Sequence, residues 1–363
     1  MGILPRTLGT RPRLACEVRA EGIVAARAED VSAVLEAVAR VALADSVVIP
    51  HVRVTDADGN GGGVAVIGRP ALVSAVRAAL DQVSLRGRDV TLVVPDAAVR
   101  VLLLDFDELP AKAAEALPVV RFRLKKLLPF DADDAAVSYQ VMSSSKGVVQ
   151  VMAVAMPREV LAEYESVVRE AGFEPGAVLP STLAALAGLG DGDRPTLVVN
   201  ANREGVTTAI VKGGLLLLHR TVDLGADARG PARTAELPGE VALDRPGDNS
   251  IAAIAARLAA AGTQAPVSGS VAANAATNEV AQAVSVAAAY FEDTLETAPA
   301  VVLAAGTLGA DALTEVLDAA GVGPVAVQEV VGSQMLGAGA ASAGTPGGVP
   351  LGWLAGVRGA LAN

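Results

Sequence analysis

The sequence of 363 residues contains few aromatic side chains, one cysteine and two histidines. Aromatic residues make up only 2% of the chain, so we expect a core built from Val, Leu and Ala. The single Cys16 excludes an internal disulfide framework, which fits a reducing cytosol. His51, His219 and Cys16 do not form a metal-ligand cluster of the usual kind, and we therefore expect no metal site.

Long uninterrupted apolar runs are also missing, although 52% of residues are hydrophobic and the mean hydropathy is +0.45. The most apolar stretches, such as Val206–Leu218 and Val301–Ala305, are cut short by Lys, Gly, Thr or Asp. No window offers the roughly 20 apolar residues of a membrane-spanning helix. Met1–Arg13 is too short and too interrupted by proline for a signal peptide. We therefore expect a cytoplasmic protein without a membrane span.

The net charge of −11 argues against binding to DNA or anionic lipid through bulk electrostatics, and we expect no nucleic-acid partner. The net charge does not exclude a local basic face, because four positive charges fall within six residues at 121–126. Such a run is usually a solvated helix surface. The sharper interpretation is one wall of a peptide groove, or a contact with a membrane surface.

The first part of the chain alternates strand and helix patterns. Two short strands are predicted at Leu14–Val18 and Ile23–Ala28. Apolar residues at helical spacing predict helices at Val31–Leu43 and Pro70–Val83. A buried strand is predicted at Asp89–Val94, and it ends at a proline.

The next segment reads as strand, helix, strand, strand and helix. The strand is Val99–Leu104, and a helix at Pro110–Leu128 is expected to break at Pro118. After the break Val120, Leu124, Leu127 and Leu128 share one face, and the basic residues share the other. Period-two strands at 137–141 and 149–154 precede an amphipathic helix at Pro157–Ala171.

The second half begins after a linker at 190–195 with a predicted meander of three strands, Thr196–Asn200, Val206–Lys212 and Leu215–Val222. Residues 226–277 are rich in Ala, Gly, Pro and Thr, and we expect a long low-complexity loop with one helix at Ile251–Ala261. The elements expected beyond it are Glu279–Leu295, Ala300–Ala305, Ala310–Ala320, Val325–Val330 and Gly352–Leu361.

The order of these elements resembles the PilM family of type IV pilus assembly proteins, relatives of FtsA in the actin-like ATPase superfamily. The resemblance is carried by Val90–Val99 (VTLVVPDAAV), Arg121–Asp131 (RFRLKKLLPFD), Tyr139–Val141 and the helix Val160–Gly172. It implies an α/β, two-lobed actin-like (ribonuclease H-like) fold with an inserted α+β subdomain. The expected parts are lobe 1 from 1–88, the insertion at 89–175, a return to lobe 1 at 176–195, lobe 2 at 196–335, and a Gly/Ala-rich tail with a closing helix at 336–363.

The resemblance places three nucleotide loops at Cys16–Val24, Asn200–Thr208 and Ala304–Gly309. The first lacks an Asp-x-Gly, the second has Asn for Asp and the bulky Arg203 and Glu204 for Gly, and the third keeps only two glycines. We therefore expect a degenerate ATPase without catalytic residues and without a bound cofactor, while ATP with Mg²⁺ stays an alternative. A site, if one is retained, would involve Asn200, Asn202, Gly205, Thr207, Gly306 and Gly309.

The family also implies a place and a partner. Its members sit at the cytoplasmic face of the inner membrane with other pilus assembly proteins, and they capture the cytoplasmic N-terminal peptide of the single-span protein PilN. We expect that groove beside the inserted subdomain, at Val101, Leu103, Arg121, Leu124 and Lys125. The alternatives are a working actin-like ATPase with divergent loops, and a secretion-system relative that carries its own membrane helix.

Overall fold

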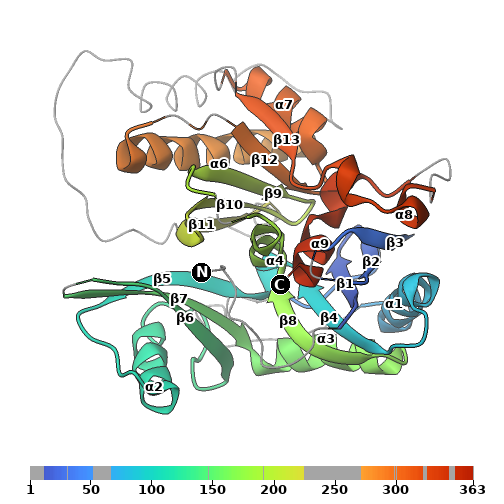
Figure 1. The fold of residues 1–363 in the computed structure, drawn as a ribbon, viewed down its shortest axis with the longest axis horizontal. Helices are drawn as coiled ribbons and strands as arrows, with labels where there is room; N and C mark the ends of the chain where they lie inside the picture. Colours follow the sequence, from blue (N-terminus) through green and yellow to red (C-terminus); the bar gives the residue numbers. More distant parts are fainter. Residues whose placement is uncertain are drawn as a thin grey trace.

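In a computed structural model of the chain, the described residues are 12–30, 32–51, 67–145, 147–190, 192–224, 271–297, 299, 301–321, 325–342 and 348–362. They form two five-stranded sheets and one three-stranded sheet (Figure 1). The helix expected at Ile251–Ala261, and most of the loop expected at 226–277, lie outside the described residues.

The first sheet has the strand order β3-β2-β1-β4-β8. Its first three strands form an antiparallel meander, and β4 and β8 continue the sheet parallel to β1. The strands are β1 (Leu14–Arg19), β2 (Gly22–Ala28), β3 (Leu35–Ala42), β4 (Asp89–Val94) and β8 (Glu174–Pro180).

The second sheet repeats this plan with the order β11-β10-β9-β12-β13. Again three antiparallel strands are followed by two strands parallel to the first. The repeated order is that of a duplicated ribonuclease H-like sheet, one for each lobe. The strands are β9 (Thr196–Ala201), β10 (Gly205–Lys212), β11 (Leu215–Asp223), β12 (Val301–Gly306) and β13 (Ala326–Glu329).

Each large sheet is covered on its outer face by two amphipathic helices. On the first sheet these are α1 (Arg69–Val83) and α3 (Arg158–Glu170), which bury their apolar stripes in one common core. On the second sheet they are α6 (Val271–Leu295) and α7 (Gly309–Ala319), with Phe291 as the largest side chain of that core. Burial of these stripes is the main source of stability of both lobes.

A third core joins the two sheets on their inner faces. It includes apolar residues of β1, β2 and β4, of β9, β10 and β12, and of two helices between the lobes. These are α4 (Ser181–Ala187) and α9 (Ala355–Leu361), which pack so closely that a Cβ on Gly359 would lie 1.8 Å from the Ala184 carbonyl oxygen. The short elements η3 (Ser333–Met335), α8 (Ala338–Ser342) and η4 (Leu351–Leu354) lead into α9.

The three-stranded sheet β5-β7-β6 is inserted in the chain between β4 and β8. Its elements are η1 (Asp96–Ala98), β5 (Arg100–Phe106), α2 (Ala113–Leu124), β6 (Ala135–Ser145) and β7 (Val148–Pro157). α2 covers the face of this sheet that points away from lobe 2 (Figure 1). β4 and α3, at the two ends of residues 89–175, pack instead in the core of the first sheet.

The helix predicted at Val31–Leu43 is wrong, because this segment contains strand β3. Its apolar residues also fit a period of two, and β3 hydrogen-bonds along the free edge of β2. Leu35 is buried there, so pairing with β2 satisfies both the backbone and the side chain. Tertiary pairing therefore overrides the helical pattern.

The helix predicted at Pro110–Leu128 is shorter than expected, and α2 continues through Pro118 instead of breaking. Ala116, Val120 and Leu124 pack on the three-stranded sheet and hold the helix together across the proline. Since α2 ends at Leu124, helical spacing no longer applies to Leu127. That side chain, expected on the apolar face, is 49% exposed.

Candidate functional site

Three turns meet where the edges of the two large sheets face each other, at the positions expected for nucleotide loops. They are the β1–β2 turn, the β9–β10 turn and the turn between β12 and α7. Glu21, from the first turn, accepts a hydrogen bond from the backbone N–H of Arg203 at 2.7 Å. The same carboxylate oxygen accepts a bond from the Thr307 hydroxyl at 2.8 Å. One carboxylate thus ties all three turns together.

The backbone N–H groups of the β9–β10 turn are all hydrogen-bonded within the protein. The Asn202 side-chain oxygen accepts hydrogen bonds from the N–H groups of Glu204 at 2.9 Å and Gly205 at 3.0 Å. The N–H of Asn202 donates to the Gly205 carbonyl. With Arg203 bonded to Glu21, the N–H groups that a phosphate would need at this turn all have protein acceptors.

The turn after β12 uses its glycine to approach the second lobe's hairpin. Gly306 has a φ of +91°, and a Cβ there would lie 2.3 Å from the Ala201 carbonyl oxygen, so only glycine fits. That carbonyl accepts the N–H groups of Thr307 at 2.8 Å and Leu308 at 3.1 Å. These two N–H groups at the start of α7 are therefore bonded to β9.

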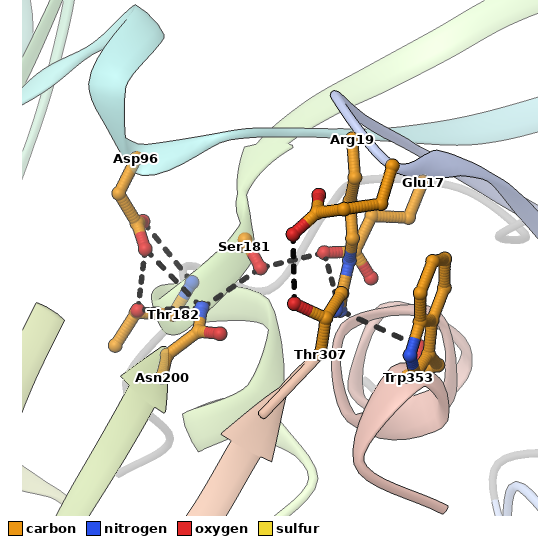
Figure 2. Close-up of polar contacts among 9 residues, drawn as sticks. Glu17, Arg19, Asp96, Ser181, Thr182, Asn200, Thr307 and Trp353 are labelled. Atoms are coloured by element: carbon orange, nitrogen blue, oxygen red, sulfur yellow. Dashed lines mark hydrogen bonds and ion pairs between the residues drawn. The ribbon is translucent and has the colours of Figure 1, made fainter. Parts of the chain in front are cut away.

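A buried polar network lies beneath the turns (Figure 2). The Asn200 side-chain N–H₂ lies 2.9 Å from the Ser181 hydroxyl, 3.0 Å from the Thr182 hydroxyl and 3.3 Å from Asp96. Asp96 also accepts the Thr182 hydroxyl at 2.5 Å and the Thr182 backbone N–H at 3.1 Å. The carboxylate therefore caps the start of α4 and holds it against β9.

An ion pair continues this network toward the C-terminal segment (Figure 2). Glu17 and Arg19 are buried and lie 2.8 Å apart, and Glu17 accepts the Ser181 hydroxyl at 2.6 Å. Arg19 donates to the Trp353 carbonyl at 3.4 Å, and the guanidinium of Arg40 stacks 4.0 Å from the Trp353 ring centre. Breaking a buried pair of this kind leaves an uncompensated charge, which is strongly destabilising.

Glu204 is the carboxyl group of the site with the largest described change in acidity. Burial raises its pKa from the ordinary 4.5 to about 7. The nearby carboxylates of Glu21 and Asp223 act in the same direction, while Arg203 opposes them. The Arg203 guanidinium points outward and pairs with Asp45 of lobe 1 at 2.6 Å. The Glu204 carboxyl group is therefore partly protonated at neutral pH, because its surroundings disfavour a further negative charge.

The structure brings together most of the residues that the sequence assigned to a degenerate nucleotide site. Asn200, Asn202, Gly205 and Gly306 all lie at the meeting point of the turns. The Thr207 hydroxyl is instead bonded to Thr221 on β11. Gly309 starts α7, where the neighbouring N–H of residue 310 is held by Glu329.

Sequence reasoning missed three acidic or hydroxyl-bearing positions of this site. Glu21 lies within the first expected nucleotide loop and Asp96 within the proline turn after a predicted strand, but the sequence indicates no contact for either side chain. Ser181 at the start of α4 was not singled out. The available signal was a Pro–Asp pair directly after a buried strand and a Pro–Ser–Thr sequence at a helix start, both of which suit a capping contact.

The residues predicted to bind a partner peptide lie on both faces of the inserted sheet. Alternation along β5 places Val101 and Leu103 on one face of the three-stranded sheet and Leu104 on the face that packs against α2. Leu124, on α2, is fully buried in that packing. Leu103 is 40% exposed, so it is the apolar residue of the set that a partner could reach.

Arg121 was expected to point into solvent, and this expectation is wrong. It is half-buried and donates to the carbonyl oxygens of Ala132 and Ala135, the latter at 3.1 Å. Lys125 is exposed but pairs with Asp133 at 2.5 Å. Both cations hold the segment between α2 and β6, because its carbonyl and carboxylate groups lie within reach of the last helical turn.

The comparisons with known proteins agree with the repeated sheet topology. A chain of a PilM-PilN type IV pilus biogenesis complex superposes with a TM-score of 0.66 at 17% identity, covering 96% of this chain and 98% of that one. The predicted two-lobed, actin-like fold is thereby confirmed. No protein-family model and no curated sequence matches this chain.

Two further solved structures are similar at lower scores. The ethanolamine utilization protein EutJ from Carboxydothermus hydrogenoformans gives a TM-score of 0.44 at 11% identity over 98% of this chain and 90% of that one. The cytoplasmic domain of EpsL, from the type II secretion system of Vibrio cholerae, gives 0.35 at 15% identity over 62% and 78%.

The residues present do not fit a Mg²⁺-bound nucleotide. The N–H groups of the second and third turns have protein acceptors, and the amide of Asn200 is bonded to Asp96, Ser181 and Thr182. Within the described residues no group of three or more His, Cys, Asp or Glu side chains could hold a metal ion. The helices described are all too short or too polar to span a membrane.

Proposed function

We propose that this chain is a PilM-type scaffold of a type IV pilus assembly complex, which works without hydrolysing ATP. The observation that carries the proposal is the Glu21 carboxylate, bonded to the Arg203 N–H and the Thr307 hydroxyl. It joins the three turns at which the resemblance to actin-like ATPases would place the phosphates of a nucleotide. The two lobes are thus held together by the protein itself.

Electrostatics supports the same proposal. A triphosphate entering the site would have to displace Glu21 and approach the carboxyl groups of Glu204 and Asp223. Arg203, the cation of the β9–β10 turn, is paired with Asp45. Negative charges repel each other strongly in a partly buried site. The carboxylates would therefore oppose the binding of ATP.

The proposed partner is a PilN-like membrane protein, bound through its cytoplasmic N-terminal peptide. The support is the likeness to a chain of a PilM-PilN complex over almost the whole length of both chains. An extended peptide would add main-chain and apolar contacts at the sheet face that carries Val101 and Leu103. Such capture would place the protein at the cytoplasmic face of the inner membrane, beside other assembly proteins.

Calorimetry with Mg²⁺-ATP, a turnover assay and peptide binding with and without nucleotide test the proposal together. We expect no heat of ATP binding, no turnover above background and the same peptide affinity in both conditions. The control variant is Asn200→Ala, which removes the amide at the centre of the site. Turnover in the natural chain that disappears in this variant would establish the alternative, a working ATPase with divergent loops.

A further inference from the structure

The outer side of α2 carries an exposed apolar and basic surface that the inserted sheet does not use. Ala116, Val120 and Leu124 point into the core, and each is 0% exposed. Val119, Phe122 and Arg123 follow the spacing i, i+3 and i+4, which places them on one side of α2, and the exposed Lys126 lies in the turn that directly follows the helix. We call these four residues the α2 outer face.

Phe122 is the central apolar residue of this face. Its side chain is 68% exposed in a protein that contains only 5 phenylalanines, and Val119 beside it is 37% exposed. Burying an aromatic ring is a large part of the driving force of many association reactions. Leu127, just beyond the end of the helix, adds a further exposed apolar group at 49%.

The two cations of the α2 outer face are free of partners among the described residues. This distinguishes them from the neighbouring Arg121 and Lys125, which hold carbonyl oxygens and Asp133. Lys112 is paired with Glu115 one turn earlier, at 3.4 Å. Arg123 and Lys126 therefore give the face a net positive charge on a chain whose total is −11.

We propose that the α2 outer face docks on the surface of an anionic lipid membrane. Exposed apolar side chains beside basic ones bind anionic bilayers through burial of apolar area together with electrostatic attraction. Each Lys or Arg near an anionic surface contributes to attraction, and the apolar ring enters the headgroup boundary. α2 covers the face of the inserted sheet that points away from lobe 2, so its outer side is turned away from both large sheets (Figure 1).

An acidic peptide is the other occupant with matching charge, and the geometry favours it less. Peptides are held in grooves or along free strand edges, where the contact surrounds the chain on more than one side. The α2 outer face belongs to a single helix and the turn after it, and its residues are exposed to solvent. The proposal is independent of the proposed function, because lipid binding requires neither nucleotide nor a pilus partner.

The test is co-sedimentation of the full chain with vesicles of phosphatidylglycerol and phosphatidylethanolamine, and with vesicles of phosphatidylcholine alone. We expect binding to the anionic vesicles only, weakening as salt is raised. Arg123→Glu with Lys126→Glu should reduce the partition coefficient about tenfold or more, and Phe122→Ser should reduce it several-fold. The matched controls are Arg194→Glu with Lys212→Glu, which changes the net charge equally at exposed positions, and Leu85→Ser at a residue that is 75% exposed.

The controls decide between a local face and a general charge effect. If both double variants lose binding equally, or if the natural chain does not bind anionic vesicles, the proposal is wrong. Binding to soluble polyglutamate but not to vesicles would assign the face to an acidic protein instead. Melting temperatures of all variants should stay close to that of the natural chain, because every substituted side chain is exposed.

Discussion

The β1–β2 and β9–β10 hairpins occupy equivalent places in the two large sheets, yet their turns have opposite chemistry. The first turn presents an acceptor, the carboxylate of Glu21. The second presents donors, the N–H groups of residues 203–205, and one of these is bonded to Glu21. In a nucleotide-binding relative of this fold both turns would face the same phosphates as donors.

This difference shows how the two halves of a duplicated fold can bond to each other through equivalent turns. Once one turn carries an acid and the other keeps its donors, the two lobes satisfy each other directly. The buried network of Asp96, Thr182 and Asn200 then fixes the lobes below the turns. If the contact between an acidic turn and a donor turn holds the two lobes together, changes to either turn should lower the free energy of unfolding.

The largest effect is expected when the acceptor is removed by Glu21→Ala. The Arg203 N–H and the Thr307 hydroxyl would lose their partner, and bonds to a charged group contribute about 1.5–3 kcal/mol each. We expect the free energy of unfolding, measured with urea, to fall by about 2–4 kcal/mol. Glu21→Gln keeps an acceptor oxygen and should lose less than half of this. Equal stability of the natural chain and both variants would show that the Glu21 contacts contribute nothing.

A smaller effect is expected from pH, through Glu204. Its pKa is raised from 4.5 to about 7 in the folded chain, so the folded state holds the proton more tightly than the unfolded state. Stability is therefore greatest below pH 4.5 for this group, falls as pH rises toward about 7, and is constant above. Because solvent screens part of this interaction, we expect the free energy of unfolding to fall by about 1–2 kcal/mol over this pH range. Glu204→Gln should remove this slope from urea unfolding measured at a series of pH values; an unchanged slope would assign it to other groups.

The smallest effect is expected at the exposed pair of Arg203 and Asp45. Their side chains are 50% and 88% exposed, and pairs of this kind contribute about 0.2–1 kcal/mol. A double-mutant cycle with Arg203→Ala and Asp45→Ala should give a coupling below about 0.5 kcal/mol. The Arg203→Ala variant keeps the backbone N–H that bonds to Glu21. A coupling above that value would mean that the Arg203–Asp45 pair, and not the Glu21 contacts, holds the lobes together.

Much of the fold could be predicted from the sequence because its signals are local. The meander from Thr196 to Val222 has alternating residues and turn residues between the strands, and the structure reproduces it. The helix at Pro157–Ala171 shows strong apolar spacing and is found at Arg158–Glu170. β3 could not be predicted, since its short apolar pattern fits two periods and only the edge of β2 decides between them.

The site was predicted less completely, because its contacts join distant parts of the chain. Three altered loops could be located from the sequence, and the structure brings them together. The role of Glu21 depends on Arg203, which is 182 residues away, and no local pattern indicates that pairing. Arg121 shows the same limit at shorter range, since its acceptors are the carbonyl oxygens of Ala132, between α2 and β6, and of Ala135, the first residue of β6.

The packing of α9 has a consequence for synthesis on the ribosome. Arg19 and its acceptor on Trp353 are separated by 334 residues, and α9 lies so close to Glu17 that a Cβ on Gly356 would be 2.4 Å from its carboxylate. At about 5–20 residues per second, the interval between making the two parts is roughly 20–70 s. During that interval the Glu17–Arg19 ion pair of β1 lacks its contacts with Trp353 and α9. The contacts of α9 and Trp353 with β1 are therefore among the last that the growing chain can complete.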